Sequence, residues 1–273
     1  MVVPLLTLSP GGDGYHQKPS VNVVASGLGP GVFSVGEELI YNVRYLFFTI
    51  GEIRVRVTGR LEEDGRKRYK TVAYIDSSPG LPFVDLHRVF ESVVSQGFYS
   101  QGFLGRGKTR DGWSYVEYEF DDSARTVIIQ KGELPSNRVT HLDTVHLKRY
   151  PYQDGFSLFY YARSGVGSGI RETIPTLIDK DTVNTSFHFH SVRSKIEIGA
   201  VEYPIDAVQV RGTAEFVGVY GMTGEFRGWF TNDEARVPVL AFIKVILGNV
   251  KIELKEWTRA GWSPPRFPVR STE

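Results

Sequence analysis

The sequence contains no cysteine, no long apolar segment and no excess of either charge. The absence of cysteine excludes disulfide bonds, thiolate catalysis and cysteine-ligated zinc. No stretch approaches the ~20 consecutive apolar residues that a membrane-spanning helix requires. The 32 basic residues nearly balance the 31 acidic residues, which gives a formal net charge of +1. The sequence therefore predicts no membrane span and no nucleic-acid-binding surface.

Motifs of common catalytic sites are absent as well. No G-x-S-x-G serine motif occurs, and the glycine-rich stretches GLGPG and GVGSG lack the lysine of a phosphate-binding loop. Adjacent residues of a strand point to opposite faces, so neighbouring carboxylates in a strand cannot share a proton. This argument applies to all four acidic pairs, Glu37-Glu38, Glu62-Glu63, Asp121-Asp122 and Asp233-Glu234. The sequence predicts no catalytic residue and no cofactor.

Aromatic residues and period-two patterns are abundant. Aromatics make up 13% of the chain, which favours half-buried pleated surfaces. In residues 51–60, Ile53, Val55 and Val57 share one face, while Arg54 and Arg56 share the other. About a dozen such segments, separated by short polar turns, predict an all-β, mostly antiparallel fold. We expect one large curved sheet, or a half-open barrel or sandwich, with one or two short helices.

Two segments carry helix signals. In residues 154–165, Asp154 can cap a helix that ends near Gly165, with Phe156, Phe159 and Tyr160 on one face. Residues 78–90 can begin a second short helix with Ser78 as its cap.

The distribution of glycine and proline predicts the domain boundaries. Residues 1–32 are rich in glycine and are expected to form a flexible lead, and residues 33–258 a single β domain. The proline-rich residues 259–273 are expected to fray. The opening MVVPLLTLSP has a short apolar run without a basic region before it, so it is either the remnant of a signal peptide or a mobile arm.

The segment from Gly228 to Trp257 contains an acidic pair that invites a catalytic interpretation. Because Asn and Asp form turns, the stretch around Asp233 and Glu234 predicts a turn between strands. Residues 237–247 are apolar on both faces, as in a strand that is covered on both sides. Gly248-Asn249 predicts a two-residue turn, and Val250, Ile252 and Leu254 should then face inward. A covered strand beside a half-covered one indicates a curved sheet with a helix, a second sheet or a ligand on its concave side.

The FHFH stretch is the best candidate for a metal site. His188 and His190 share a face of the expected strand, and His141 lies two residues from Asp143. The alternative is that the histidines lie on a solvated face opposite Phe187 and Phe189, which would then be the buried pair.

Three segments together carry a resemblance to a known family. They are FSVGEELIYNVRYLFFTIGEIRVRV (33–57), DGFSLFYYARS (154–164) and GWFTNDEARVPVLAFIKVILGNVKIEL (228–254). In this order they resemble the bacterial family of exported cell-envelope proteins known as domain of unknown function 3108. The resemblance implies one antiparallel β domain, export to the periplasm or envelope, and no known activity. The curved sheet is also similar in style to that of the periplasmic lipoprotein carriers.

Three functional hypotheses follow. The first is a non-enzymatic carrier for a lipid or another hydrophobic molecule, lined by Leu240, Phe242, Phe159 and Tyr160, with residues 156–161 as a plug or lid. The second is a structural or assembly protein of the envelope, with a self-packed interior and protein partners. The third is a metal-dependent enzyme that uses His188, His190 and His141.

Overall fold

The structure is a computed structural model that describes residues 31–63, 65–81, 85–148, 151–217, 223–245 and 248–268. Within these ranges the chain forms fifteen strands and one helix. The elements are β1 (Glu38–Tyr45), β2 (Phe48–Glu63), β3 (Arg66–Ser77), β4 (His87–Ser95), β5 (Ser100–Lys108), β6 (Trp113–Asp121), β7 (Thr126–Leu134), β8 (Arg138–His146), β9 (Gln153–Asp154), α1 (Ser157–Ser164), β10 (Arg171–Ile178), β11 (Asp181–Ile196), β12 (Ile205–Val217), β13 (Thr223–Thr231), β14 (Pro238–Lys244) and β15 (Asn249–Thr258).

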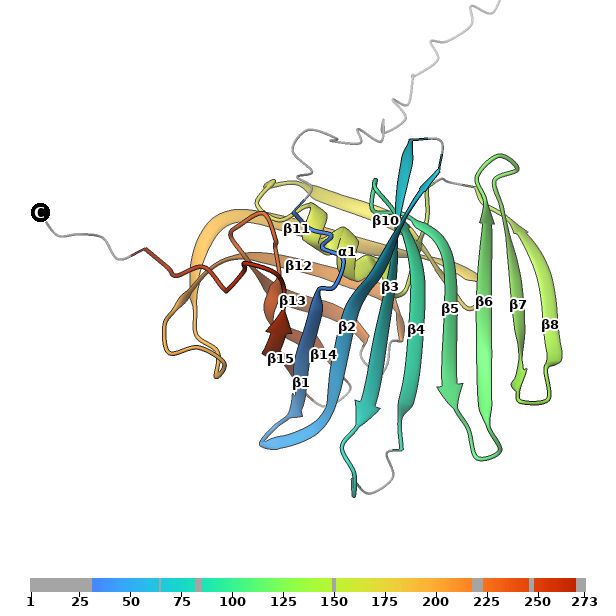
Figure 1. Ribbon diagram of the computed structural model, residues 1–273, viewed down its shortest axis with the longest axis horizontal. Coiled ribbons are helices and arrows are strands. Elements are labelled where there is room, and N and C mark those ends of the chain that lie inside the picture. Colours follow the sequence, from blue (N-terminus) through green and yellow to red (C-terminus); the bar gives the residue numbers. More distant parts are fainter. Residues whose placement is uncertain are drawn as a thin grey trace, which may run out of the picture.

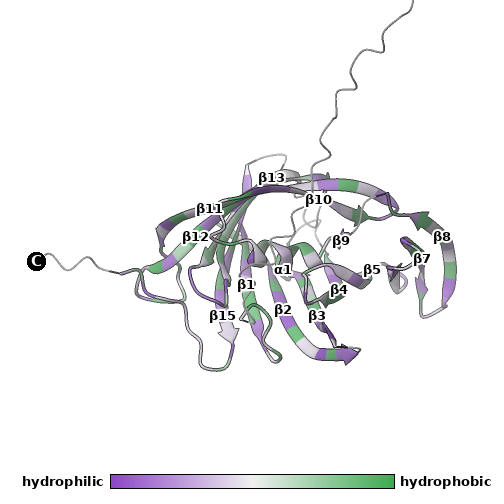
Figure 2. Ribbon diagram, turned by 90° about the horizontal axis from the view of Figure 1, so that it is seen from above, coloured by the Kyte–Doolittle hydropathy of each residue, from purple (hydrophilic) through white to green (hydrophobic). Residues whose placement is uncertain are grey.

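All fifteen strands belong to one sheet, in the order β8-β7-β6-β5-β4-β3-β2-β1-β15-β14-β13-β12-β11-β10-β9. Neighbouring strands are antiparallel except β9 and β10, which are parallel. The first and last strands, β1 and β15, pair in the middle of this order. The sheet curls so that its two halves form facing walls (Figures 1 and 2). This confirms the predicted all-β class and the large, curved, mostly antiparallel sheet.

The alternation seen in the sequence decides which side chains face inward. In β2, Val55 and Val57 are buried, whereas Arg54 and Arg56 between them are exposed. Tight turns join the strands where the sequence predicted them. Glu63 pairs with Arg66, and Gly65 in the turn between them has a φ of +71°, which suits glycine.

Helix α1 lies between the two walls of the sheet (Figure 2). Its buried residues join the main hydrophobic core, together with residues from both walls such as Val55 and Phe189. A smaller core forms near the edges of the sheet around Ile129 and Leu177. No helix in the described part of the chain has both the length and the apolar character that crossing a membrane would require.

The prediction of a second helix in residues 78–90 is wrong within the described residues. Pro79 and Gly80 form a turn, and strand β4 begins at His87. Residues 82–84 lie outside the described residues. The reason is that β4 pairs with β3 from His87 onward, so its backbone groups are bonded in the sheet.

Three further expectations need correction. Asn249 is the first residue of β15 and pairs with Lys244, so Gly248-Asn249 does not form the predicted two-residue turn, although Gly248 does have a positive φ. The tail does not fray from residue 259: the Phe267 amide donates to the Pro204 carbonyl at 2.8 Å. Val32, which belongs to the segment predicted to be a flexible lead, is buried in the core. Residues 1–30 and 269–273 lie outside the described residues.

Candidate functional site

A large cavity lies between the concave side of the sheet and helix α1. Its volume is about 730 Å³, within the range of ~300–1,000 Å³ that is typical of small-molecule sites. One side is formed by the helix and the residues before it, and the other sides by both walls of the sheet. Residues that line it include Tyr41, Ile53, Ile75, Arg88, Phe90, Phe103, Val116, Phe156, Leu158, Phe159, Ala162, Leu177, Phe187, Phe226, Leu240, Ala241, Ile243 and Ile252.

The lining is apolar apart from a few groups. Tyr41 contributes a hydroxyl that is buried and has no hydrogen-bond partner among the described residues. Burial raises the pKa of Tyr41 well above its usual value, so this hydroxyl stays protonated and can donate. Arg88 supplies a cation at the end of β4 that is far from the helix. The other polar side chains of the lining are Tyr118, Asp179, Thr185 and Arg227. A mainly apolar space with a few polar groups can hold an apolar molecule and orient its polar end.

A buried ion pair holds helix α1 in the hollow. The two terminal nitrogens of the Arg163 guanidinium, Nη1 and Nη2, donate to the Glu37 carboxylate at 2.7 and 3.1 Å, and Nη2 also donates to the Ala235 carbonyl at 2.7 Å. Arg259 donates to the same carboxylate. Burial alone would lower the pKa of Arg163, but the Glu37 carboxylate outweighs it and leaves the pKa raised. The pair joins the residue before β1, the helix and the turn after β13.

The acidic pair at Asp233 and Glu234 lies in that turn, as predicted. Asp233 Oδ1 accepts hydrogen bonds from the Thr231 hydroxyl at 2.7 Å and from the Arg236 amide at 3.0 Å. Its Oδ2 accepts from the Trp262 indole at 2.7 Å. These bonds hold the loop that presents the Ala235 carbonyl to Arg163, so Asp233 has a structural role.

Asp154 anchors the other end of the helix and joins the edge strand β9 to β4 and β5 in the other half of the sheet. Its Oδ1 accepts from the amides of Phe156 and Ser157 at 2.7 and 2.8 Å, at the start of α1. The hydroxyls of Ser92 on β4 and Ser100 on β5 donate to the same carboxyl at 2.9 and 2.6 Å. Burial raises the pKa of Asp154, and these hydrogen bonds offset only part of that effect.

Two of the four predicted lining residues border the cavity and two do not. Leu240 and Phe159 line it. Phe242 lies in an outer groove, because its neighbours Ala241 and Ile243 occupy the inward positions of β14. Tyr160 is fully buried in the core, where its ring packs 5.0 Å from that of Phe33.

The histidines of the metal hypothesis do not come together. His188 and His190 are adjacent on the outer face of β11, with ring centroids 4.0 Å apart, opposite the buried Phe187 and Phe189. His141 lies on β8, at the far edge of the sheet from β11. Among the described residues, no three His, Asp or Glu side chains are placed to hold one metal ion.

The sequence did not reveal the charged groups that position the helix. In the sequence Glu37 is one half of an acidic pair, and no motif marks Arg163 as a site residue. A signal was present, since Arg163 is a charged residue among the aromatic residues of a short helix. Charged residues are almost never fully buried without a partner. If the helix packs in the core, Arg163 therefore needs a carboxylate from another part of the chain.

Comparison with known proteins identifies the family. A family model described as a protein of unknown function, DUF3108, matches residues 40–255. The chain belongs to this family. It is also similar in structure to the beta-barrel-like protein of domain of unknown function DUF1849 from Brucella abortus, with a TM-score of 0.53. That match covers 82% of this chain and 97% of the other at 9% sequence identity, which establishes a likeness of fold alone. No curated protein is detectably similar in sequence.

The buried pair in this DUF3108 domain predicts a specific stability pattern. Glu37→Gln should lower the free energy of unfolding by about 3–5 kcal/mol, because it leaves the buried Arg163 without its carboxylate. Arg163→Met should lower it by less, because Arg259 still donates to Glu37. The double variant should lose less than the sum of the two single losses. Urea denaturation of the four proteins measures the coupling.

The neighbouring surface pair is a matched control. Arg56 lies 2.9 Å from Glu38, but its side chain is 50% exposed. Arg56→Met should therefore change the free energy of unfolding by only about 0–1 kcal/mol. Additive losses for Glu37→Gln and Arg163→Met, or losses no larger than that of the control, would show that the buried pair does not hold the helix.

The raised pKa of Asp154 predicts that the free energy of unfolding depends on pH. Its raised pKa means that the folded protein keeps this proton at pH values where the unfolded chain, with an ordinary pKa of ~3.9, has lost it. Across that window the free energy of unfolding falls as the pH rises. In Asp154→Asn the side-chain amide oxygen can still accept from the helix amides. The variant has no titrating carboxyl at this position, so the pH dependence that Asp154 contributes to the free energy of unfolding is lost. The difference in stability between the variant and the wild type should therefore grow in the variant's favour as the pH rises from about 4. Chemical denaturation across this range tests it, and a constant difference would contradict it.

Proposed function

We propose that this DUF3108 protein is a non-enzymatic carrier that binds a lipid or another apolar small molecule in the cavity beside α1. We place it in the periplasm or cell envelope, on the resemblance of its three sequence segments to exported envelope proteins. The observation that carries the proposal is the apolar cavity of about 730 Å³. A purely structural protein with a self-packed interior would have no use for such a space.

The shape of the cavity supports an elongated ligand. Phe156, Phe159 and Ala162 border it at the helix, and Arg88 and Ile243 border it at the other end of the strands. The helix is fixed at one end by a buried ion pair and at the other by the hydrogen bonds of Asp154, so it acts as a rigid end wall and not as a lid. A ligand would therefore enter from the end far from the helix, and the Tyr41 hydroxyl would meet any polar group that reaches the inner part.

An exposed apolar hairpin lies at that same end. Leu46, Phe47 and Phe48, in and beside the turn between β1 and β2, are 68%, 87% and 66% exposed. Register links the hairpin to the cavity, because Ile243 pairs with Val250, Val250 with Tyr45, and Tyr45 with Phe48. Three large exposed side chains in succession are costly in water. We infer that they enter a lipid surface when the carrier loads or releases its ligand.

Ligand binding is tested by filling the cavity. Ala241→Phe places a ring where the small Ala241 side chain borders the cavity. Binding of the neutral fluorescent probe N-phenyl-1-naphthylamine should weaken at least tenfold in this variant. Mass spectrometry of an organic extract of the purified wild-type protein should show a bound apolar molecule that the variant lacks.

A control variant separates cavity filling from a general effect of added bulk. Ile128 on β7 is 42% exposed, so Ile128→Phe adds a similar ring at the surface and should leave probe binding unchanged. The proposal fails if the wild type carries no apolar molecule and also ignores the probe. It fails equally if Ala241→Phe binds the probe as well as the wild type does.

Membrane contact is tested with the hairpin. The double variant Phe47→Ser, Phe48→Ser should lose most of its flotation with phosphatidylcholine vesicles, because the two most exposed aromatic side chains of the hairpin no longer enter the lipid. Val192→Ser removes an apolar side chain that is 73% exposed on β11 and should float like the wild type. Equal flotation of all three proteins would exclude the hairpin as the contact.

A further inference from the structure

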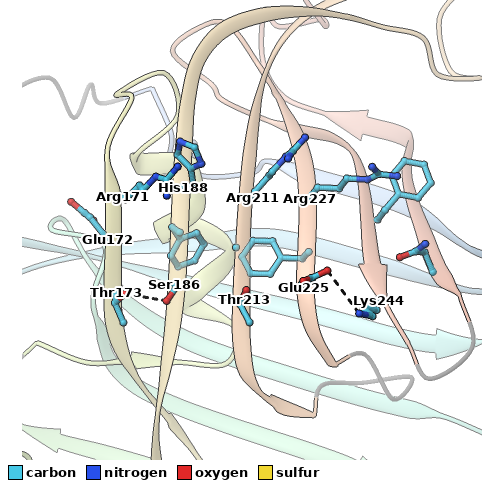
Figure 3. A pocket seen from close by; sticks show the side chains of 15 residues that line it. Arg171, Glu172, Thr173, Ser186, His188, Arg211, Thr213, Glu225, Arg227 and Lys244 are labelled. Carbon is cyan, nitrogen blue, oxygen red and sulfur yellow. Dashed lines mark hydrogen bonds and ion pairs between the residues drawn. The ribbon is translucent and has the colours of Figure 1, made fainter.

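The outer face of β10 to β13 carries a row of four basic side chains in direct register. Arg171 pairs with His188, His188 with Arg211, and Arg211 with Arg227. These residues line a groove of about 740 Å³ on the side of the sheet away from α1 (Figure 3). With strands ~4.8 Å apart, the row spans about 14 Å. The row lies on the outer face of the sheet and does not depend on the function proposed for the cavity. Phe187, Phe226 and Arg227 border both spaces.

The charges of this row are not neutralised by the protein. Among the described residues, none of the three arginines forms an ion pair: Arg211 donates to Gln209 at 2.7 Å, and Arg227 lies 5.0 Å from the Phe242 ring centre. Glu225 in the groove pairs with Lys244 instead, at 3.9 Å. Like charges directly opposite each other on a sheet are destabilising. In a chain with a net charge of only +1, such a row is a local departure from the balance of charge.

Hydroxyl groups lie beside the cations. Two residues further along each strand, Thr173, Ser186 and Thr213 form a second row in register on the same face (Figure 3). The hydroxyls of Thr173 and Ser186 are 3.0 Å apart, and each can turn to donate to a bound group. Arginines that fork toward oxygen pairs, with hydroxyl donors beside them, match the needs of phosphate oxygens.

The histidines extend the row on its other side. The His190 ring lies next to that of His188, tilted by 36°, and its Nε2 is buried without a hydrogen-bond partner among the described residues. Desolvation, followed by the nearby charges of His188, Arg211 and Arg171, lowers the pKa of His190. A bound anion would offset that repulsion and give the ring nitrogen an acceptor when it is protonated.

We propose that this groove is a binding site for a ligand that carries two or more phosphate groups. Each phosphate would lie between neighbouring cations of the row Arg171, His188, Arg211 and Arg227, with the hydroxyl row donating to its remaining oxygens. A single cation at the surface binds phosphate weakly in salt, whereas a row of four lets a diphosphate engage several at once.

The experiment uses inorganic pyrophosphate as the probe, at physiological ionic strength. Calorimetric titration should show saturable binding, and the imidazole signals of His188 and His190 should shift in NMR spectra. Arg211→Gln, Arg227→Gln should weaken binding at least tenfold. Arg54→Gln, Arg56→Gln is the control, because it removes two exposed arginines from the other wall that pair with Glu52 and Glu38, and it should bind like the wild type.

A second arm distinguishes the source of the phosphate. The same variants are floated with phosphatidylcholine vesicles that contain phosphatidic acid. Binding of pyrophosphate alone identifies a soluble ligand, and groove-dependent binding of the vesicles alone identifies a lipid headgroup. Groove-dependent binding of both supports the shared phosphate chemistry. Binding of neither, or equal binding by the groove and control variants, would overturn the proposal.

Discussion

The buried pair of Glu37 and Arg163 is the constraint on which the rest of the molecule depends. A curled sheet of apolar strands does not by itself determine what fills its hollow. Here a short helix enters the hollow with a charged residue that is fully buried, and the carboxylate that meets it precedes the first strand. Since an unpaired charge in this place would cost several kcal/mol, the helix is stable only where Glu37 and the Ala235 carbonyl are both in reach. The helix position then sets how much of the hollow stays open.

The three segments that resemble the DUF3108 family meet at this point. Glu37 comes from the first segment, Arg163 from the second, and Ala235 from the third. Asp154, at the start of the second segment, ties the helix to the serines of β4 and β5. Polar groups thus fix the helix at both ends and leave the apolar side chains between them to line the cavity. This division of roles explains how a cavity of about 730 Å³ persists in a chain that could otherwise collapse around its own side chains.

Much of the fold was predictable because strand patterning is local. The alternation of Val55 and Val57 with Arg54 and Arg56 defines a strand with one buried face without reference to any other part of the chain. The same is true of the turn at Gly65. The buried pair was not predictable in this way, because Glu37 and Arg163 are far apart in sequence and neither residue names its partner. Phe242 shows a second limit: the hydrophobic run that contains it gives no sign of which face is inward, and pairing with Arg227 on β13 places Phe242 in the outer groove.

The inner cavity and the outer groove both result from the alternation of side chains between the two faces of the same strands. On β11 and β13, Phe187 and Phe226 border the cavity, and His188 and Arg227, next to them in sequence, belong to the outer row. Only one sheet separates the two sites. At Gly212 the Phe226 ring lies so close to the backbone that a Cβ atom would be only 2.3 Å from it. Phe187 and Phe226 border both spaces. A ligand in the cavity that moves these two rings therefore also changes the floor of the outer groove. Binding in the cavity and binding in the groove can thus be coupled through these rings, without a change of fold.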